Sequence, residues 1–225
     1  MQLVRSLFLD LFNTLVSVGN VPFSVGKLTA DILGFDHDTW NNVCFGPQHE
    51  ICQPTQHIDI IRTLAHSIDP KTPDHLIEQA VTARQSRFDY ALTHVEPVII
   101  EALQQFKQQR LTLVLISNAS TAEVQAWQHS PLSALFDHAI FSCESGFKKP
   151  QAEIYQHAMS ISASHSSQCL YIGDGGSQEF LGAKQLELRT VLTKQFIKPK
   201  RYQHVIAEQG KAIDTEITTL NQLYF

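Results

Sequence analysis

The feature that most constrains this chain is a regular alternation of strand-like and helix-like segments that begins after Glu96-Pro97. Four short β-prone segments are each preceded by a longer segment with helical spacing of its apolar residues. The β-prone segments are 111–116, 138–142, 169–173 and 189–192, and the helical segments are 98–109, 122–128, 151–161 and 178–186. Strands that are connected in this way through helices lie parallel in one sheet, with helices on both faces. The sequence therefore predicts an α/β fold.

One further β-prone segment, residues 3–9, lies near the N-terminus and stops at Asp10. The stretch that follows it is helical in pattern. This first strand can join the parallel sheet only if the intervening residues form an insertion. We therefore predict a Rossmann-like parallel-sheet core made of residues 1–15 and 96–225, with an inserted α-helical cap domain at residues 16–95.

The predicted cap has the spacing of an amphipathic helix. Apolar residues recur three and four positions apart at Ile58, Ile61 and Leu64. Prolines, which favour the first turn of a helix, stand at Pro54 and Pro73. A similar spacing near the other end predicts a terminal helix that docks on the core, and it comprises Ile217, Leu220 and Leu223.

The composition argues against two classes of partner. The chain has 17 basic and 22 acidic residues and a net charge of −5, whereas a nucleic-acid-binding domain usually carries a basic face. Its longest apolar stretches, such as residues 111–116, are far shorter than the ~20 residues that a membrane-spanning helix needs. We expect neither a nucleic acid nor a membrane as partner.

The cysteines and the first residues indicate a cytoplasmic protein. Four cysteines are widely spaced and form no C-x-x-C pair, which is typical of reduced thiols rather than of a disulfide framework or a zinc site. They are Cys44, Cys52, Cys143 and Cys169. Arg5 interrupts the first apolar stretch and Asp10 ends it, so no secretory signal is expected. The oligomeric state is not determined by the sequence, and a homodimer is left open.

Polar residues follow the predicted strands. Asp10 follows the first strand, Ser117-Asn118 the second, Lys148-Lys149-Pro150 the third, and Asp174 the fourth. Each alone is an ordinary turn or helix-cap residue. Ligands of an open parallel sheet bind outside the carboxyl ends of its strands, however, so these side chains should meet at one edge. Two acids, a hydroxyl and a lysine there predict a site for a metal ion and an anionic substrate.

These segments carry a specific resemblance. Residues 8–15 read FLDLFNTL, residues 113–118 read LVLISN, residues 146–155 read GFKKPQAEIY, and residues 171–174 read YIGD, followed by Glu179. In this order they resemble the four motifs of the haloacid dehalogenase (HAD) superfamily, whose members are mostly phosphatases. The first motif of that family is a strand ending in D-x-D-x-T. The matches span residues 8–183.

The resemblance implies a mechanism. Asp10 would be the nucleophile that forms an aspartyl-phosphate on a small phosphorylated metabolite. Magnesium would be held by the Asp10 carboxylate, the Phe12 backbone carbonyl and the Asp174 carboxylate. Ser117, and Asn118 through its backbone N–H, would bind phosphate oxygens. Lys149 would neutralise charge on the nucleophile and the phosphoryl group.

Two positions depart from the family pattern. Phe12 stands where the family has a second aspartate that acts as general acid and base, a role worth ~10²–10⁴-fold in rate. Glu179 stands where the family has aspartate, and its longer side chain would reach the metal through water. A histidine of the cap could replace the missing acid.

Three functions remain open. The first is a magnesium-dependent phosphohydrolase, and the second is a 2-haloacid dehalogenase-type hydrolase acting at a carbon centre. Dehalogenases of that type resemble this chain in having an aromatic residue at the position of Phe12. They have an arginine about thirty residues past the nucleophile, whereas no arginine lies between Arg5 and Arg62 here, and they lack the acid that Asp174 supplies. The third is a weakly active or non-catalytic binding protein on the HAD fold.

Overall fold

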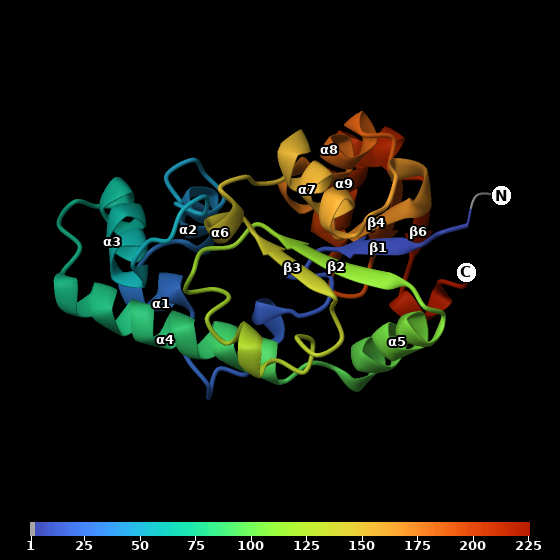
Figure 1. The fold of residues 1–225 in the computed structure, drawn as a ribbon. Coiled ribbons are helices and arrows are strands. Elements are labelled where there is room, and N and C mark those ends of the chain that lie inside the picture. The colour runs from blue at the N-terminus through green and yellow to red at the C-terminus, as the bar shows by residue number, and fades with distance from the viewer. Residues whose placement is uncertain (1–2) are drawn as a thin grey trace.

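The computed structural model describes residues 3–225 and contains a six-stranded parallel sheet (Figure 1). The strand order is β3-β2-β1-β4-β5-β6, and neighbouring strands pair in parallel. The strands are β1 (Ser6–Leu9), β2 (Thr112–Ser117), β3 (His138–Phe141), β4 (Cys169–Gly173), β5 (Arg189–Thr193) and β6 (Thr215–Ile217). The predicted α/β fold is confirmed. The first two residues of the expected core segment 1–15 lie outside the described residues.

Helices cover both faces of the sheet, because successive side chains of its buried strands point to opposite faces and both sets are apolar. In β1, Leu7 and Leu9 point into one apolar cluster and Phe8 into another. Helix α5 (Pro97–Gln108) packs in the first cluster, and α7 (Ala152–Ile161), α8 (Glu179–Gln185) and α9 (Pro199–Gln209) pack in the second (Figure 1). Because all strands are parallel, their carboxyl ends lie along one edge.

Four helices lie beside the sheet, at the left of Figure 1. They are α1 (Thr29–Leu33), α2 (His37–Cys44), α3 (His57–Ile68) and α4 (Asp74–Thr93). They enclose an apolar cluster of their own, which includes Trp40, Ile61, Leu64 and Ile77. Helix α4 begins directly after Pro73, as the sequence predicts, and α3 begins three residues after Pro54. That these helices act as a cap domain stays a prediction.

The predicted helix at 122–128 is not formed. This stretch is a series of turns that ends in a short 3₁₀ segment, Trp127–His129. Glu123 accepts a hydrogen bond from the backbone N–H of Ser120 and pairs with Arg84 of α4. Both Val124 and Trp127 are nevertheless buried. Contacts with the rest of the fold therefore determine this backbone, rather than local helical preference.

The predicted terminal helix is also wrong. Ile217 ends strand β6, and Leu220–Gln222 form a single 3₁₀ turn. Threonine and isoleucine predominate in residues 215–219, and such β-branched residues favour a strand, which here pairs with β5. Ile217 and Leu220 still reach the core and are buried in it.

The remaining elements are short. Helix α6 (Ser142–Ser145) follows β3 directly, and 3₁₀ turns occupy Val18–Asn20, Ser166–Gln168, Gly176–Gln178 and Gly210–Ala212. Among the helices between residues 3 and 225, none has both the length and the apolar character that crossing a bilayer demands.

Candidate active site

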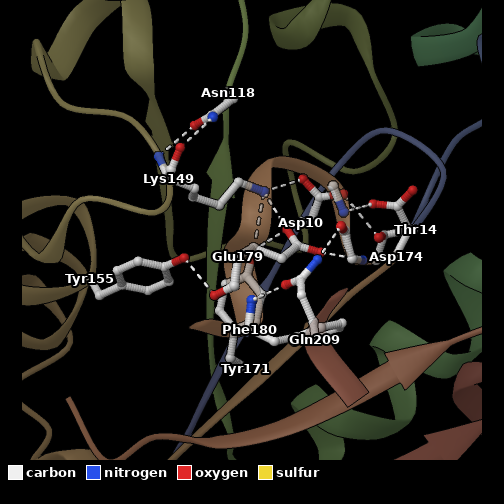
Figure 2. A network of polar contacts seen from close by, with 12 residues as sticks. Asp10, Thr14, Asn118, Lys149, Tyr155, Tyr171, Asp174, Glu179, Phe180 and Gln209 are labelled. Carbon is white, nitrogen blue, oxygen red and sulfur yellow. Dashed lines mark hydrogen bonds and ion pairs between the residues drawn. The ribbon is translucent and has the colours of Figure 1, made fainter. Parts of the chain in front are cut away.

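The carboxyl ends of β1, β2 and β4 bring four of the predicted site residues to one edge of the sheet. Asp10 follows β1, Ser117 ends β2, and Asp174 follows β4, while Lys149 reaches the same place from the loop after α6. All four are buried. Figure 2 shows Lys149 pointing between Asp10 and Glu179.

An ion-pair centre forms around Lys149. Its Nζ lies 2.5 Å from Asp10 Oδ1, 2.7 Å from Glu179 Oε2 and 3.1 Å from the hydroxyl of Tyr171 (Figure 2). Burial opposes the charge on this side chain, but the carboxylates of Asp10 and Glu179 raise the pKa of Lys149 above its usual value. The other oxygen of Asp10 accepts a hydrogen bond of 2.9 Å from the Thr14 hydroxyl. Lys149 is therefore held charged beside Asp10.

Three buried carboxylates share this centre. Oxygen atoms of Asp10, Asp174 and Glu179 all lie within 4.8 Å of one another. Burial, and then the charge of Asp10, raises the pKa of Asp174 to about 6. Burial raises the pKa of Glu179 to about 7, and the neighbouring acids add to this although Lys149 acts against it. One lysine does not balance three acids, so the site favours an additional cation.

The oxygens of Glu179 are already engaged by protein donors. Oε2 accepts from Lys149 and, at 2.7 Å, from the Tyr171 hydroxyl, and Oε1 accepts from the Gly175 N–H at 2.7 Å. The carboxylate also fills the space beside Gly173, where a Cβ would clash with it. These contacts tie Glu179 to Lys149 more directly than to a metal. Its contribution to a metal through water stays a prediction.

A residue of α9 holds the turn between Asp174 and Glu179, the first residue of α8. The buried side-chain amide of Gln209 donates to the Gly175 carbonyl at 2.8 Å and accepts from the Phe180 N–H at 3.1 Å (Figure 2). Nothing in the sequence distinguishes Gln209, because a glutamine in a helix near the C-terminus resembles an ordinary surface residue.

Ser117 and Asn118 lie in different surroundings. The Ser117 hydroxyl is buried and finds no hydrogen-bond partner within residues 3–225, which suits a group that awaits a ligand. The Asn118 side chain is instead bonded twice to the backbone of Lys149, donating to its carbonyl at 2.9 Å and accepting from its N–H at 2.7 Å. Asn118 therefore positions the lysine loop with its side chain.

Phe12 presents an aromatic ring and a free carbonyl. The ring meets Phe88 of α4 edge-on, with the centroids 5.3 Å apart. Within the described residues, no donor reaches the Phe12 carbonyl oxygen. The chain thus offers backbone oxygen and two carboxylates, of Asp10 and Asp174, which are the ligands that magnesium prefers.

A second polar cluster joins the four helices to the loop after β2. The Arg84 guanidinium lies over the Phe88 ring, 4.3 Å from its centroid, and pairs with the buried Glu123. His49 Nε2 lies 3.9 Å from the same carboxylate. Burial, together with the charge of Arg84, lowers the pKa of His57 to about 4. His57 is therefore neutral near pH 7 and is poorly suited to replace the acid that is missing at Phe12.

Two tyrosines lie behind the centre, and only Tyr171 contacts its charged groups. Tyr171 contacts both Lys149 and Glu179, and Tyr155 of α7 donates to the Glu179 backbone carbonyl at 2.8 Å. The sequence singles out neither tyrosine, because both fit the pattern of core residues. The signal for Tyr171 is its position two residues before Gly173, which places both on the same face of β4.

Comparison with known proteins agrees with this geometry. A family model described as haloacid dehalogenase-like hydrolase matches residues 4–186. The Drosophila melanogaster rhythmically expressed gene 2 protein is 31% identical over 124 residues, which cover 52% of this chain and 46% of that protein. The chain spans about half the length of the curated relatives that it matches.

Solved structures share the fold at low sequence identity. A 2-haloacid dehalogenase from Pseudomonas syringae pv. tomato DC3000 is 22% identical, with a TM-score of 0.59 and coverage of 98% of this chain and 96% of that one. A β-phosphoglucomutase from Clostridium difficile is 14% identical, with a TM-score of 0.65 and coverage of 99% and 94%. Since the family model matches most of its residues, the chain belongs to the haloacid dehalogenase-like hydrolase family.

Proposed function

We propose that the protein is a magnesium-dependent phosphohydrolase that acts on a small phosphorylated metabolite through an aspartyl-phosphate on Asp10. The observation that carries this proposal is the buried pair of Asp10 and Lys149 beside a second acid, Asp174. A carboxylate nucleophile, a fixed positive charge and a further anionic ligand are the groups that phosphoryl transfer needs. The reaction is proposed for the cytoplasm, where thiols such as the four free cysteines stay reduced.

In the proposed reaction, a carboxylate oxygen of Asp10 forms a bond to phosphorus while the bond from phosphorus to the leaving group breaks. The Lys149 ammonium, 2.5 Å from Asp10, offsets negative charge as these anions approach. The Ser117 hydroxyl, which is buried and unpartnered within residues 3–225, donates to a phosphate oxygen. Phe12 transfers no proton, so the leaving group departs without help from this position.

Magnesium would be held by the carboxylates of Asp10 and Asp174 and by the Phe12 backbone carbonyl. These residues fit a cation, because the buried acids outnumber the one lysine among them and their oxygens lie within 4.8 Å. When bound, magnesium supplies positive charge to the phosphate and to the carboxylates around it. Glu179 would act on it only through water.

Residues 16–95 would serve as a cap over this edge of the sheet. Phe88 of α4 packs on Phe12 two residues after the nucleophile, and Arg84 of the same helix pairs with Glu123 in the loop after Ser117. The four helices therefore meet the loops after both β1 and β2. Closure there would exclude water from the reaction.

The proposal is tested by a screen of small phosphate esters with magnesium, followed by acid trapping of the phosphoenzyme. Wild-type protein should release phosphate from at least one ester and accumulate label on Asp10. Asp10→Asn should do neither while it remains folded by circular dichroism. A labelled phosphoenzyme in the Asp10→Asn variant would place the nucleophile elsewhere.

Phe12 supports a second candidate, a hydrolase acting at a carbon centre. Its aromatic ring stands at the position where 2-haloacid dehalogenases also have an aromatic residue. The ring packs against Phe88 of α4. A panel of 2-haloacids tested with chelator beside the phosphate esters separates the two functions. Turnover of neither panel, together with binding of phosphate, would favour a binding protein on this fold.

A further inference from the structure

The hydroxyl of Tyr171 occupies an unusual position behind the active site. Its side chain is fully buried, and its ring packs edge-on against Tyr155 and Phe180 in the core of the sheet. Only the hydroxyl extends to the ion-pair centre, where it lies 3.1 Å from Lys149 Nζ and 2.7 Å from Glu179 Oε2. A phenylalanine would satisfy the core equally well.

The three groups form a closed ring of hydrogen bonds. Lys149 donates to both Tyr171 and Glu179, and Tyr171 donates to the same Glu179 oxygen. A lysine ammonium has three protons, and here they meet three buried acceptors, the third being Asp10 Oδ1. The ammonium therefore has one defined orientation.

This ring of hydrogen bonds matters most when Asp10 reacts. Once an Asp10 oxygen is bonded to phosphorus, the carboxylate no longer carries its full negative charge, and its attraction for Lys149 weakens. The contacts to Tyr171 and Glu179 are unaffected by that step. These two contacts therefore continue to hold Lys149 in place during phosphoryl transfer.

We propose that Tyr171 is a positioning residue. Together with Glu179, it holds the Lys149 ammonium against the phosphoryl group after that group has become bonded to Asp10. The expected effect on turnover rests on the proposed function, whereas the expected effect on the orientation of Lys149 does not. Tyr155 provides a matched comparison. Its hydroxyl also binds Glu179, at 2.8 Å, but through the backbone carbonyl and not through the carboxylate that faces Lys149.

The test compares Tyr171→Phe with Tyr155→Phe, since each removes one buried hydroxyl next to Glu179. Turnover of p-nitrophenyl phosphate with magnesium should fall about 10-fold or more in Tyr171→Phe, as expected for a lost hydrogen bond to a charged group, with KM within about twofold. Tyr155→Phe should retain kcat within about twofold. Equal kcat values for the two variants would overturn the proposal.

A second measurement does not depend on activity. In 1H–15N NMR spectra of the lysine ammonium groups, a buried and fully bonded Lys149 should give a resonance protected from exchange with water, assigned by its loss in Lys149→Met. Tyr171→Phe should broaden or shift this resonance, whereas Tyr155→Phe should preserve it. An unchanged resonance in Tyr171→Phe overturns the positioning role.

The two readouts separate the possible failures. If wild-type protein turns over no phosphate ester, the proposed function fails, while the resonance still decides whether Tyr171 positions the lysine. If Tyr171→Phe does not fold, 3-fluorotyrosine at this position keeps the hydroxyl and weakens it as an acceptor. The Lys149 resonance should then shift, and an unchanged resonance would count against the proposal.

Discussion

Replacing Asp174 by asparagine should make the metal-free protein more stable at alkaline pH, although it removes a proposed metal ligand. Asparagine is similar in shape and can still accept the 2.8 Å hydrogen bond from the Gly176 N–H. What it removes is one of three buried negative charges gathered around Lys149. Functional sites that concentrate like charges commonly reduce stability in this way.

The magnitude follows from the pKa of Asp174, which burial and the charge of Asp10 raise from 3.8 to about 6. A carboxyl whose pKa is raised in the folded state contributes stability that is fully present below its unfolded pKa, near 4. This contribution is lost as the pH rises through about 6. One pKa unit corresponds to 1.36 kcal/mol, so a shift of about two units costs the folded protein roughly 3 kcal/mol above pH 7. Asp174→Asn should recover up to that amount at pH 8 and almost nothing at pH 4.

Urea unfolding in the presence of chelator, at pH 4.5, 6 and 8, measures the difference directly. Asp137→Asn is a suitable control, because the pKa of Asp137 is lowered by its ion pair with Lys107 even though burial acts the other way. The same substitution there should reduce stability at pH 8, with the opposite sign. An Asp174→Asn protein that is no more stable than wild type at pH 8 would refute the reasoning. Added magnesium should stabilise wild type but not the variant.

Three further predictions concern the substrate side of the site. Phe12→Asp restores an acid and should raise turnover of alkyl phosphates at least ~10-fold. It also loses the ring contact with Phe88, worth ~0.5–1.5 kcal/mol, so circular dichroism must accompany the steady-state kinetics. A folded variant with no gain on any phosphate ester would argue against a phosphatase. Ser117→Ala should weaken binding of inorganic phosphate with magnesium in calorimetry, while its unfolding midpoint stays near that of wild type because the hydroxyl has no partner within residues 3–225. Unchanged phosphate affinity would remove Ser117 from the site. Hydrogen exchange in residues 29–93 should slow when phosphate and magnesium are bound, because a cap closes over its ligand. Unaltered exchange under proven binding would contradict the cap role.

The fold was predictable wherever local pattern and tertiary environment agree. The buried strands and the helices between them follow from alternating segments, and Pro73 correctly marked the start of α4. The stretch 122–128 has apolar residues at helical spacing. Glu123, however, forms an ion pair with Arg84, which lies in a helix nearly forty residues earlier. No local pattern encodes a contact of that kind. The prediction of a terminal helix was wrong for a similar reason, because β6 forms by pairing with β5, which no local pattern shows.

The site was predictable to the extent that strand ends define it. Asp10, Ser117 and Asp174 follow directly from the rule that parallel strands present their carboxyl ends at one edge. The roles of neighbouring side chains depend on direction and distance, which the sequence does not contain. Asn118 turns toward the backbone of Lys149, and the Tyr171 hydroxyl emerges from the core beside it.

The central position of β1 has a consequence for how the chain acquires its structure. This strand is synthesised before the other strands of the sheet. Its partner β2 begins at Thr112 and its other partner β4 at Cys169, which is 160 residues after Leu9. At ~5–20 residues per second, roughly 8 to 30 s pass between synthesis of the strand and of its second neighbour. Four consecutive buried residues, Ser6–Leu9, thus remain without one of their two neighbouring strands during this time, while the cluster formed by α1–α4 can already collapse. Nascent chains should therefore be most prone to aggregation, and most dependent on chaperones, before β4 leaves the ribosome.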